Sequence, residues 1–220
     1  MNFFDQLKSV TEPERQQLFA VPIIQDALQG KVSTSQYIAF LSQAYHHVKH
    51  TVPLLMGCGS RLDSRHEWLR EAIAEYIEEE VGHQEWILSD IAACGGDPEP
   101  VRRARPHPAT ELMVAYAYHQ VDRGNPVAFF GMVHVLEGTS TALATHAADT
   151  IRSALSLPPQ AFSYLSSHGS LDLDHVAFFE GLMNRLDDEA DRQAVIHMAR
   201  MMYGLYGNVF RGLPRDGSAS

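Results

Sequence analysis

The chain has 220 residues, of which 45% are hydrophobic and 20% charged, a composition typical of one globular domain with a substantial core. Acidic residues outnumber basic residues 27 to 17, and the formal net charge of −10 argues against a nucleic acid or an anionic membrane as a partner. The two cysteines form no disulfide framework, the N-terminus shows no export signal, and no uncharged apolar run has the roughly 18 residues of a membrane span, so we expect a soluble cytoplasmic protein.

Apolar residues recur at helical spacing along almost the whole chain. Helices are expected over residues 3–29, 35–62, 63–94, 109–123, 126–155 and 159–167, followed by one helix or a pair over 170–187 and 188–212. Pro53 is expected to kink the second helix near His50, and the four prolines of residues 97–108 favour an extended connection. No segment alternates with the two-residue period of a half-buried strand. The sequence therefore predicts one all-α domain over residues 1–212 and a disordered tail over 213–220.

The stretch from Tyr164 to His175 contains the first candidate metal ligands. His168, Asp172 and His175 are spaced i, i+4 and i+7, so on one helix their side chains fall within about 60° of one another. Two imidazoles and a carboxylate on one face of a helix are costly to bury in an apolar core, and they are typical ligands of a transition metal. The two histidines are separated by roughly 10 Å along the helix axis, which suits two ions about 3.5–4 Å apart, with Asp172 between them, better than one ion.

A second group of candidates lies in the acidic run Glu78-Glu79-Glu80-Val81-Gly82-His83. Glu80 and His83 form the Glu-x-x-His pair with which di-iron helical proteins place a carboxylate and an imidazole together. Glu79, four residues before His83, is an equally good geometric partner. A solvated outer face is the alternative for such a run and the expectation for Glu78. Neighbouring apolar residues, however, place His83 near the apolar side of its helix.

Glu137 is the only acidic residue between Asp122 and Asp149, in an otherwise apolar stretch. A buried lone carboxylate is costly unless it is paired or coordinates a metal. We therefore expect a cation beside Glu137, either a metal ion or, in the structural alternative, an arginine. His134, three residues earlier, is expected to pack in the core.

Three histidines on the second predicted helix, His46, His47 and His50, lie beside the expected kink. They could line a pocket or supply a ligand, although a solvated polar face is favoured for His47. The tyrosines that are candidates for lining the same pocket are Tyr45, Tyr76 and Tyr118.

Together these motifs resemble the heme-oxygenase-like di-metal oxidases, the iron-containing redox enzymes of a larger group that also holds the thiaminase II and pyrroloquinoline-quinone synthase folds. The resemblance covers most of the chain. It is carried by the Glu-Glu-x-Gly-His motif of residues 79–83, the lone Glu137, and His168-x3-Asp172-x2-His175. It implies a heme-oxygenase-like bundle of seven to eight helices, commonly a homodimer, with two irons in a solvent-shielded site.

The same resemblance implies the activity and the roles of residues. Members activate O2 to oxidise small molecules such as fatty acids, amino-acid side chains or an internal tyrosine. Mixed imidazole and carboxylate ligation suits Fe(II), with Mn(II) as the near competitor. The metal ligands implied are Glu80 or Glu79, His83, Glu137, His168, Asp172 and His175. The catalytic residues expected are Glu80, Glu137 and Tyr45.

Two related activities fit the sequence less well. Thiaminase II needs a cysteine nucleophile on the helix that here reads Val114-Ala115-Tyr116-Ala117-Tyr118, and no cysteine follows Cys94. Heme oxygenase uses a proximal histidine on its first helix, and this chain has none before His46. Two other functions stay open. One is a metal-free hydrolase or lyase of a heteroaromatic compound, with Glu80 and Glu137 as general acid and base. The other is a non-catalytic helical binding protein.

Overall fold

The computed structural model describes residues 1–170 and 172–215, and within these ranges the side chains of residues 168–170 and 172–174 lie outside the description. The described chain is helical and contains no strand, which confirms the predicted all-α class. The α-helices are α1 (Phe3–Phe19), α2 (Pro22–Leu28), α3 (Thr34–Val48), α4 (Thr51–Arg61), α5 (Glu67–Glu80), α6 (His83–Ala93), α7 (Pro98–Arg103), α8 (Pro108–Arg123), α9 (Phe129–Leu155), α10 (Ser163–Ser170), α11 (Asp172–Arg185) and α12 (Glu189–Arg211).

Three of the predicted long helices are each divided into two. The first is divided between α1 and α2 because Val21 is extended and Pro22 has no N–H to continue the ladder. The kink expected near His50 is a complete break between α3 and α4. Pro53 lies in the first turn of α4, where backbone N–H groups have no acceptor within the helix, so proline there removes no helical hydrogen bond. The third is divided between α5 and α6, where Gly82 has a φ of 96°.

The connection over residues 97–108 is not fully extended as predicted, because it contains the short helix α7. The Asp97 side chain accepts the Glu99 backbone N–H at 3.0 Å, and Pro98 occupies the first helical position. A capping carboxylate followed by proline is a strong helix start, so the prolines here begin a helix instead of preventing one.

The segment expected to be a disordered tail begins with residues that pack on the bundle. Leu213 is buried, Gln36 Nε2 donates to the Pro214 carbonyl at 3.1 Å, and Arg215 forms an ion pair with Asp26 at 2.9 Å. Residues 216–220 lie outside the described part of the chain.

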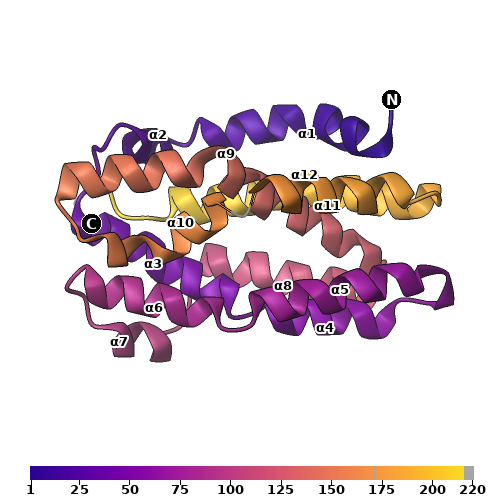
Figure 1. Cartoon of the computed structure of the whole chain (residues 1–220), viewed down its shortest axis with the longest axis horizontal. Coiled ribbons are helices and arrows are strands. Elements are labelled where there is room, and N and C mark those ends of the chain that lie inside the picture. The colour runs from indigo at the N-terminus through magenta and orange to yellow at the C-terminus, as the bar shows by residue number, and fades with distance from the viewer. Residues whose placement is uncertain (171, 216–220) are drawn as a thin grey trace.

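The helices form an elongated bundle with α9 near its centre (Figure 1). In this view α1 and α2 lie along one edge, α4 to α7 lie along the opposite edge, and α9 and α12 run between them. The most extensive packing of α9 is against α10 and α12. By length and hydropathy alone the segment Pro126–Leu155 could cross a membrane, but 61% of its apolar window is buried inside the protein. This helix is therefore the core of the bundle.

Gly131 allows the closest approach between α9 and α12. A Cβ atom at this position would lie 2.8 Å from both the Ala199 backbone nitrogen and the Met198 Cβ, and closer still to the Val195 carbonyl oxygen. Two of these three atoms belong to the backbone of α12, which cannot move aside as a flexible side chain can. The packing of the two central helices therefore requires glycine.

We expect Gly131→Ala to lower the free energy of unfolding by about 3 kcal/mol, because the two helices must separate to admit the methyl group. Gly204→Ala in α12, where a Cβ would meet nothing within 4 Å, is the matched control. It should raise stability by about 0.5–1 kcal/mol through its effect on helix propensity. Urea denaturation followed by circular dichroism measures both changes. Equal stability of the two variants would contradict the close-packing interpretation.

Candidate metal centre

Two acidic side chains from helices distant in sequence meet at one cavity. Glu80, the last residue of α5, and Glu137, in the middle of α9, both line a cavity of about 70 Å³. The Glu80 side chain is 20% exposed and Glu137 is half-buried. Much of the remaining lining is apolar and includes Leu55, Phe129 and Met132. Glu137 is thus half-buried at a cavity, and its role as a metal ligand stays a prediction.

Glu80 also meets His83, although the two residues are not on one continuous helix as predicted. Glu80 ends α5 and His83 begins α6, and Gly82 turns the chain between them in the left-handed conformation. His83 Nδ1 lies 3.1 Å from Glu80 Oε2, and the buried imidazole packs on Trp86 with ring centroids 4.1 Å apart. The helix break therefore keeps the carboxylate and the imidazole in contact.

Glu79 has a different imidazole partner. His175 Nε2 of α11 lies 3.3 Å from Glu79 Oε2, with the two side chains 26% and 41% exposed. The structure therefore separates the two alternatives left open by the sequence: Glu80 faces the cavity and His83, whereas Glu79 faces α11 nearer to solvent. The side chains of the predicted ligands His168 and Asp172 lie outside the part of the chain that the structure describes.

Tyr76 places a buried hydroxyl beside these acids. Its oxygen lines the same cavity region and has no hydrogen-bond partner among the described residues. Burial raises the pKa of the Tyr76 phenol, and the negative charges of Glu137, Glu79 and Glu80 raise it further. The phenol therefore stays protonated and offers one hydrogen bond to the acidic cluster.

The histidines of α3 and its following turn divide into two groups. His47 is buried, meets the Tyr206 ring edge-on and lines the cavity with Glu80, so the expectation of a solvated face was wrong. His46 and His50 do not line this cavity. His46 Nδ1 lies 3.2 Å from Lys49 Nζ, and burial together with the Lys49 charge lowers its pKa to about 4. His50 Nδ1 lies 3.0 Å from a hydroxyl, that of Tyr118.

Tyr45 was expected to be catalytic, but it does not line the cavity of Glu80 and Glu137. Its ring packs beside His46, and the Lys49 ammonium lies 5.2 Å from the ring centroid. A catalytic role for Tyr45 stays a prediction, whereas Tyr76 is the tyrosine next to the acids.

Asp90 is a fully buried acid that the sequence reasoning did not single out. It lies on α6, seven residues after His83, and its carboxylate accepts the backbone N–H groups of Ser163 at 3.1 Å and Tyr164 at 2.9 Å. Burial raises the pKa of Asp90, while these hydrogen bonds lower it. The carboxylate thus ties the start of α10 to α6. An acid flanked by Ile87, Leu88 and Ile91 was the sequence signal for this role.

Glu137 also lines a second cavity, of about 340 Å³, between α1, α9, α11 and α12. Lys8, Arg15 and His134 line this cavity as well. His134 is buried and stacks on Phe179, as expected of a core residue. Burial, with smaller contributions from the Lys8 and Arg15 charges, lowers the pKa of His134 to about 4.

The donor types at the first cavity, carboxylate oxygen and imidazole nitrogen, are those that suit iron. Among the residues whose side chains are described, no three such groups lie close enough together to hold an ion. Two carboxylate–imidazole pairs are present instead, Glu80 with His83 and Glu79 with His175. The chemistry of the donors and the buried Tyr76 hydroxyl beside them fit a cation at this position.

Comparisons with known proteins agree with this chemistry. A family model described as iron-containing redox enzyme matches residues 38–207. The chain is similar in structure to a domain of unknown function with a heme oxygenase-like fold from Shewanella denitrificans (25% identity, TM-score 0.83, 96% of this chain and 91% of that chain). The fold is shared by a heme oxygenase from Leptospira interrogans, at 15% identity and a TM-score of 0.77, with 97% of this chain and 100% of that chain covered. It is also shared by a TenA homologue from Pseudomonas syringae, at 11% identity and a TM-score of 0.79, with 95% of this chain and 91% of that chain covered. No curated protein matches the sequence. The fold is therefore heme oxygenase-like, as the resemblance implied.

Asp90→Ala should lower the free energy of unfolding by about 2 kcal/mol, because two backbone N–H groups at the start of α10 lose their acceptor. Asp90→Asn, which keeps one carbonyl oxygen, should cost less. Asp149→Ala, at an exposed acid of α9, is the control and should change stability by no more than about 0.5 kcal/mol. Denaturant titration at neutral pH compares the three, and a loss in Asp90→Ala no larger than in the control would refute the anchoring role.

His134 should make the protein sensitive to acid. The folded state keeps the imidazole neutral down to about pH 4, whereas an unfolded histidine takes up its proton near the ordinary value of 6.5. Stability is therefore lost as the pH falls from about 6.5 to about 4, by on the order of 3 kcal/mol. His134→Phe should remove most of this loss when unfolding is measured at both ends of the window. An unchanged pH dependence would show that His134 titrates normally in the folded protein.

Proposed function

Because the chain belongs to the family of iron-containing redox enzymes, we propose that it is a non-heme di-iron oxidase that activates O2 to oxidise a small organic substrate. The observation that carries the proposal is the meeting of Glu80 and Glu137, from separate helices, at one largely apolar cavity. The residues proposed to hold iron are Glu80, Glu79, His83, Glu137, His168, Asp172 and His175.

Electrostatics supports a cation at this cavity. Carboxylates withdrawn from water are stable only when charge or hydrogen bonds compensate their lost hydration. The Tyr76 hydroxyl and the imidazoles of His47 and His83 supply part of this compensation. The apolar part of the lining, Leu55, Phe129 and Met132, supplies none. Ferrous iron bound there would balance the acids and would supply the electrons needed to reduce O2.

The protein's own residues have separate tasks in this proposal. With Nδ1 of His83 in contact with Glu80, a metal would bind this imidazole through Nε2, and the carboxylate would fix the orientation of the ring. Tyr76 retains its proton at the acidic cluster and can donate it in a hydrogen bond to a carboxylate or to substrate. The apolar residues keep bulk water away from the reacting groups.

A non-heme centre is favoured because α1 carries no histidine, whereas the resemblance to heme oxygenases implies a proximal histidine on the first helix. The TenA homologue also shares the fold, and a metal-free enzyme using Glu80 and Glu137 as acid and base is the competing function. Metal content separates the two.

Anaerobic addition of Fe(II) to the metal-depleted protein should give two bound irons per chain and an optical change on exposure to O2. His175→Ala should bind no more than one iron, because the imidazole beside Glu79 is lost. His146→Ala, at an exposed histidine of α9, is the control and should bind as the unaltered protein does. Elemental analysis measures the stoichiometry. Two irons retained in His175→Ala would contradict the ligand assignment, and no iron in the unaltered protein would favour the metal-free enzyme.

A further inference from the structure

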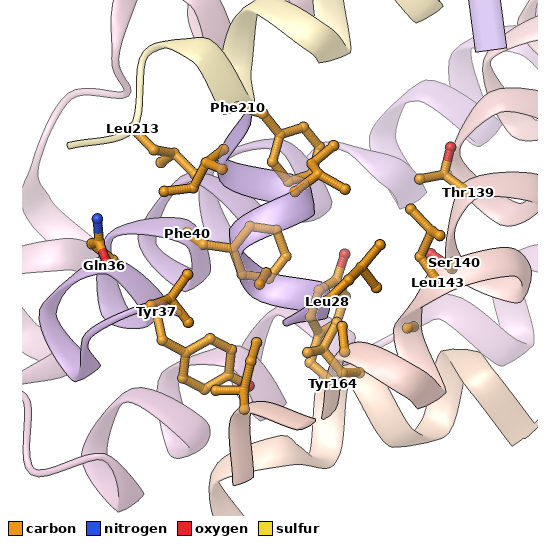
Figure 2. Close-up of a pocket in the computed structure, with 18 of the residues that line it drawn as sticks. Leu28, Gln36, Tyr37, Phe40, Thr139, Ser140, Leu143, Tyr164, Phe210 and Leu213 are labelled. Carbon is orange, nitrogen blue, oxygen red and sulfur yellow. The ribbon is translucent and has the colours of Figure 1, made fainter. Parts of the chain in front are cut away.

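A third cavity, lined almost entirely by apolar side chains, adjoins the acidic cavity of Glu80 and Glu137 (Figure 2). This apolar cavity has a volume of about 100 Å³ and lies between α2, α3, α9, α10 and α12, and its lining contains no acidic residue, basic residue or histidine. Ser140, Tyr164 and Tyr206 line both cavities. Because apolar cavities stay dry, the candidate metal centre borders on this side a region that bulk water does not readily enter. Its protection on the side of α5 and α6 has to come from other residues.

On the side of α5 and α6, the indole of Trp86 covers the candidate ligand His83. The two residues are three positions apart on α6, so their side chains are neighbours on one face of the helix. Their ring centroids are 4.1 Å apart, and the ring planes are inclined by 34°. His83 is 5% exposed, whereas Trp86 is 40% exposed. The indole is therefore the outer ring of the pair and covers the imidazole on the side towards solvent.

Two contacts restrain the His83 imidazole in different directions. Glu80 Oε2 lies 3.1 Å from Nδ1 of His83, so this contact acts along an edge of the ring. The indole of Trp86 lies against a face of the ring. The torsion that turns a histidine ring about its Cβ–Cγ bond has broad energy minima, so one hydrogen bond leaves the ring free to tilt. A stacked indole opposes this tilt, and the two contacts together define one orientation of the ring.

Helix α7 holds the backbone that carries the two rings. Arg102 of α7 donates two hydrogen bonds to the Glu85 carboxylate, at 2.9 and 2.7 Å. Glu85 lies between His83 and Trp86 in the first turn of α6. Bidentate arginine–carboxylate pairs are geometrically specific, and this pair fixes the turn that follows the left-handed Gly82. The indole and the imidazole therefore stack on a defined backbone.

The exposure of Trp86 also needs a local reason. An indole that stays 40% exposed forgoes part of the free energy that its burial would provide. Trp86 lines neither the acidic cavity nor the apolar cavity, so it does not serve a ligand in either of them. The ring that it contacts is that of His83. These observations point to a role of Trp86 in the surroundings of this imidazole.

We propose that Trp86 is a positioning residue of the candidate metal centre, whose indole fixes the orientation of the His83 imidazole and shields it from water. Nε2 of His83 is thereby kept for a metal ion while Glu80 stays in contact with Nδ1. The inference rests on the proposed function for what His83 binds, but the restraint of the ring depends only on the described contacts.

Diethyl pyrocarbonate, which acylates accessible imidazole nitrogens, tests this role in the metal-depleted protein. Trp86→Ala should raise the rate of reaction at His83 about tenfold, because a buried ring otherwise reacts only during local opening. Trp86→Phe keeps a flat ring at this position and should restore the slow rate. Peptide mass spectrometry measures the reaction, with the exposed His146 as the reference within each protein. Met201→Ala, which truncates an α12 side chain that is 39% exposed, is the matched control and should leave the rate at His83 unchanged.

Trp86→Leu separates stacking from simple packing, because leucine keeps an apolar side chain without a flat face. It should react at His83 as fast as Trp86→Ala does. It also keeps the test valid if circular dichroism shows that Trp86→Ala does not fold. A slow rate in Trp86→Leu, or equal rates in Trp86→Ala and the unaltered protein, would overturn the proposal.

Anaerobic titration with Fe(II) measures the consequence for the metal centre. Trp86→Ala should weaken iron binding about tenfold, as is common when a residue that orients a metal ligand is removed, and Trp86→Phe should bind nearly as the unaltered protein does. Equal Fe(II) affinity of Trp86→Ala and the unaltered protein would reject the positioning role. If the unaltered protein takes up no iron but His83 reacts faster in Trp86→Ala, the restraint of His83 by Trp86 is retained and the oxidase is rejected.

Discussion

The strongest physical constraint on this bundle is the cost of removing carboxylates from water. Glu80 and Glu137 approach one cavity from α5 and α9, and the protonated Tyr76 phenol lies buried beside them. Each such group loses hydration that the apolar walls cannot replace. Imidazoles from α6 and α11 meet the neighbouring acids at hydrogen-bond distance. The proposed irons would complete this compensation.

The break between α5 and α6 positions side chains of the candidate metal centre. The left-handed turn at Gly82 ends α5 directly after Glu80 and starts α6 with His83, so that both side chains face each other across the turn. Seven residues further along α6, Asp90 holds the first residues of α10 through two backbone hydrogen bonds. One short helix therefore positions a candidate ligand and anchors the helix on which His168 lies.

The kind of cavity that the central helix α9 lines changes within one helical turn. Glu137 faces the two cavities that contain charged or polar side chains, whereas the face from Thr139 to Ile151 lines the apolar cavity. Close packing of α9 on α12 at Gly131 fixes how deeply these two faces of α9 lie in the bundle. A rigid core helix thus places the acidic cavity and the apolar cavity next to each other.

Local patterns in the sequence determined the helical class and pointed to Glu137 and His83, because apolar periodicity and a lone acid in an apolar run depend only on near neighbours in the chain. They did not determine where the long helices break, since Val21, Gly82 and the turn at His50 act through backbone conformation that periodicity does not show. The burial of His47, the choice between Glu80 and Glu79 at the cavity, and the role of Asp90 were decided by the tertiary structure. Each of these depends on which helix packs opposite. The partners lie from 33 residues away in the chain, for His47 and Glu80, to 159 residues away, for His47 and Tyr206, beyond the reach of any local spacing rule.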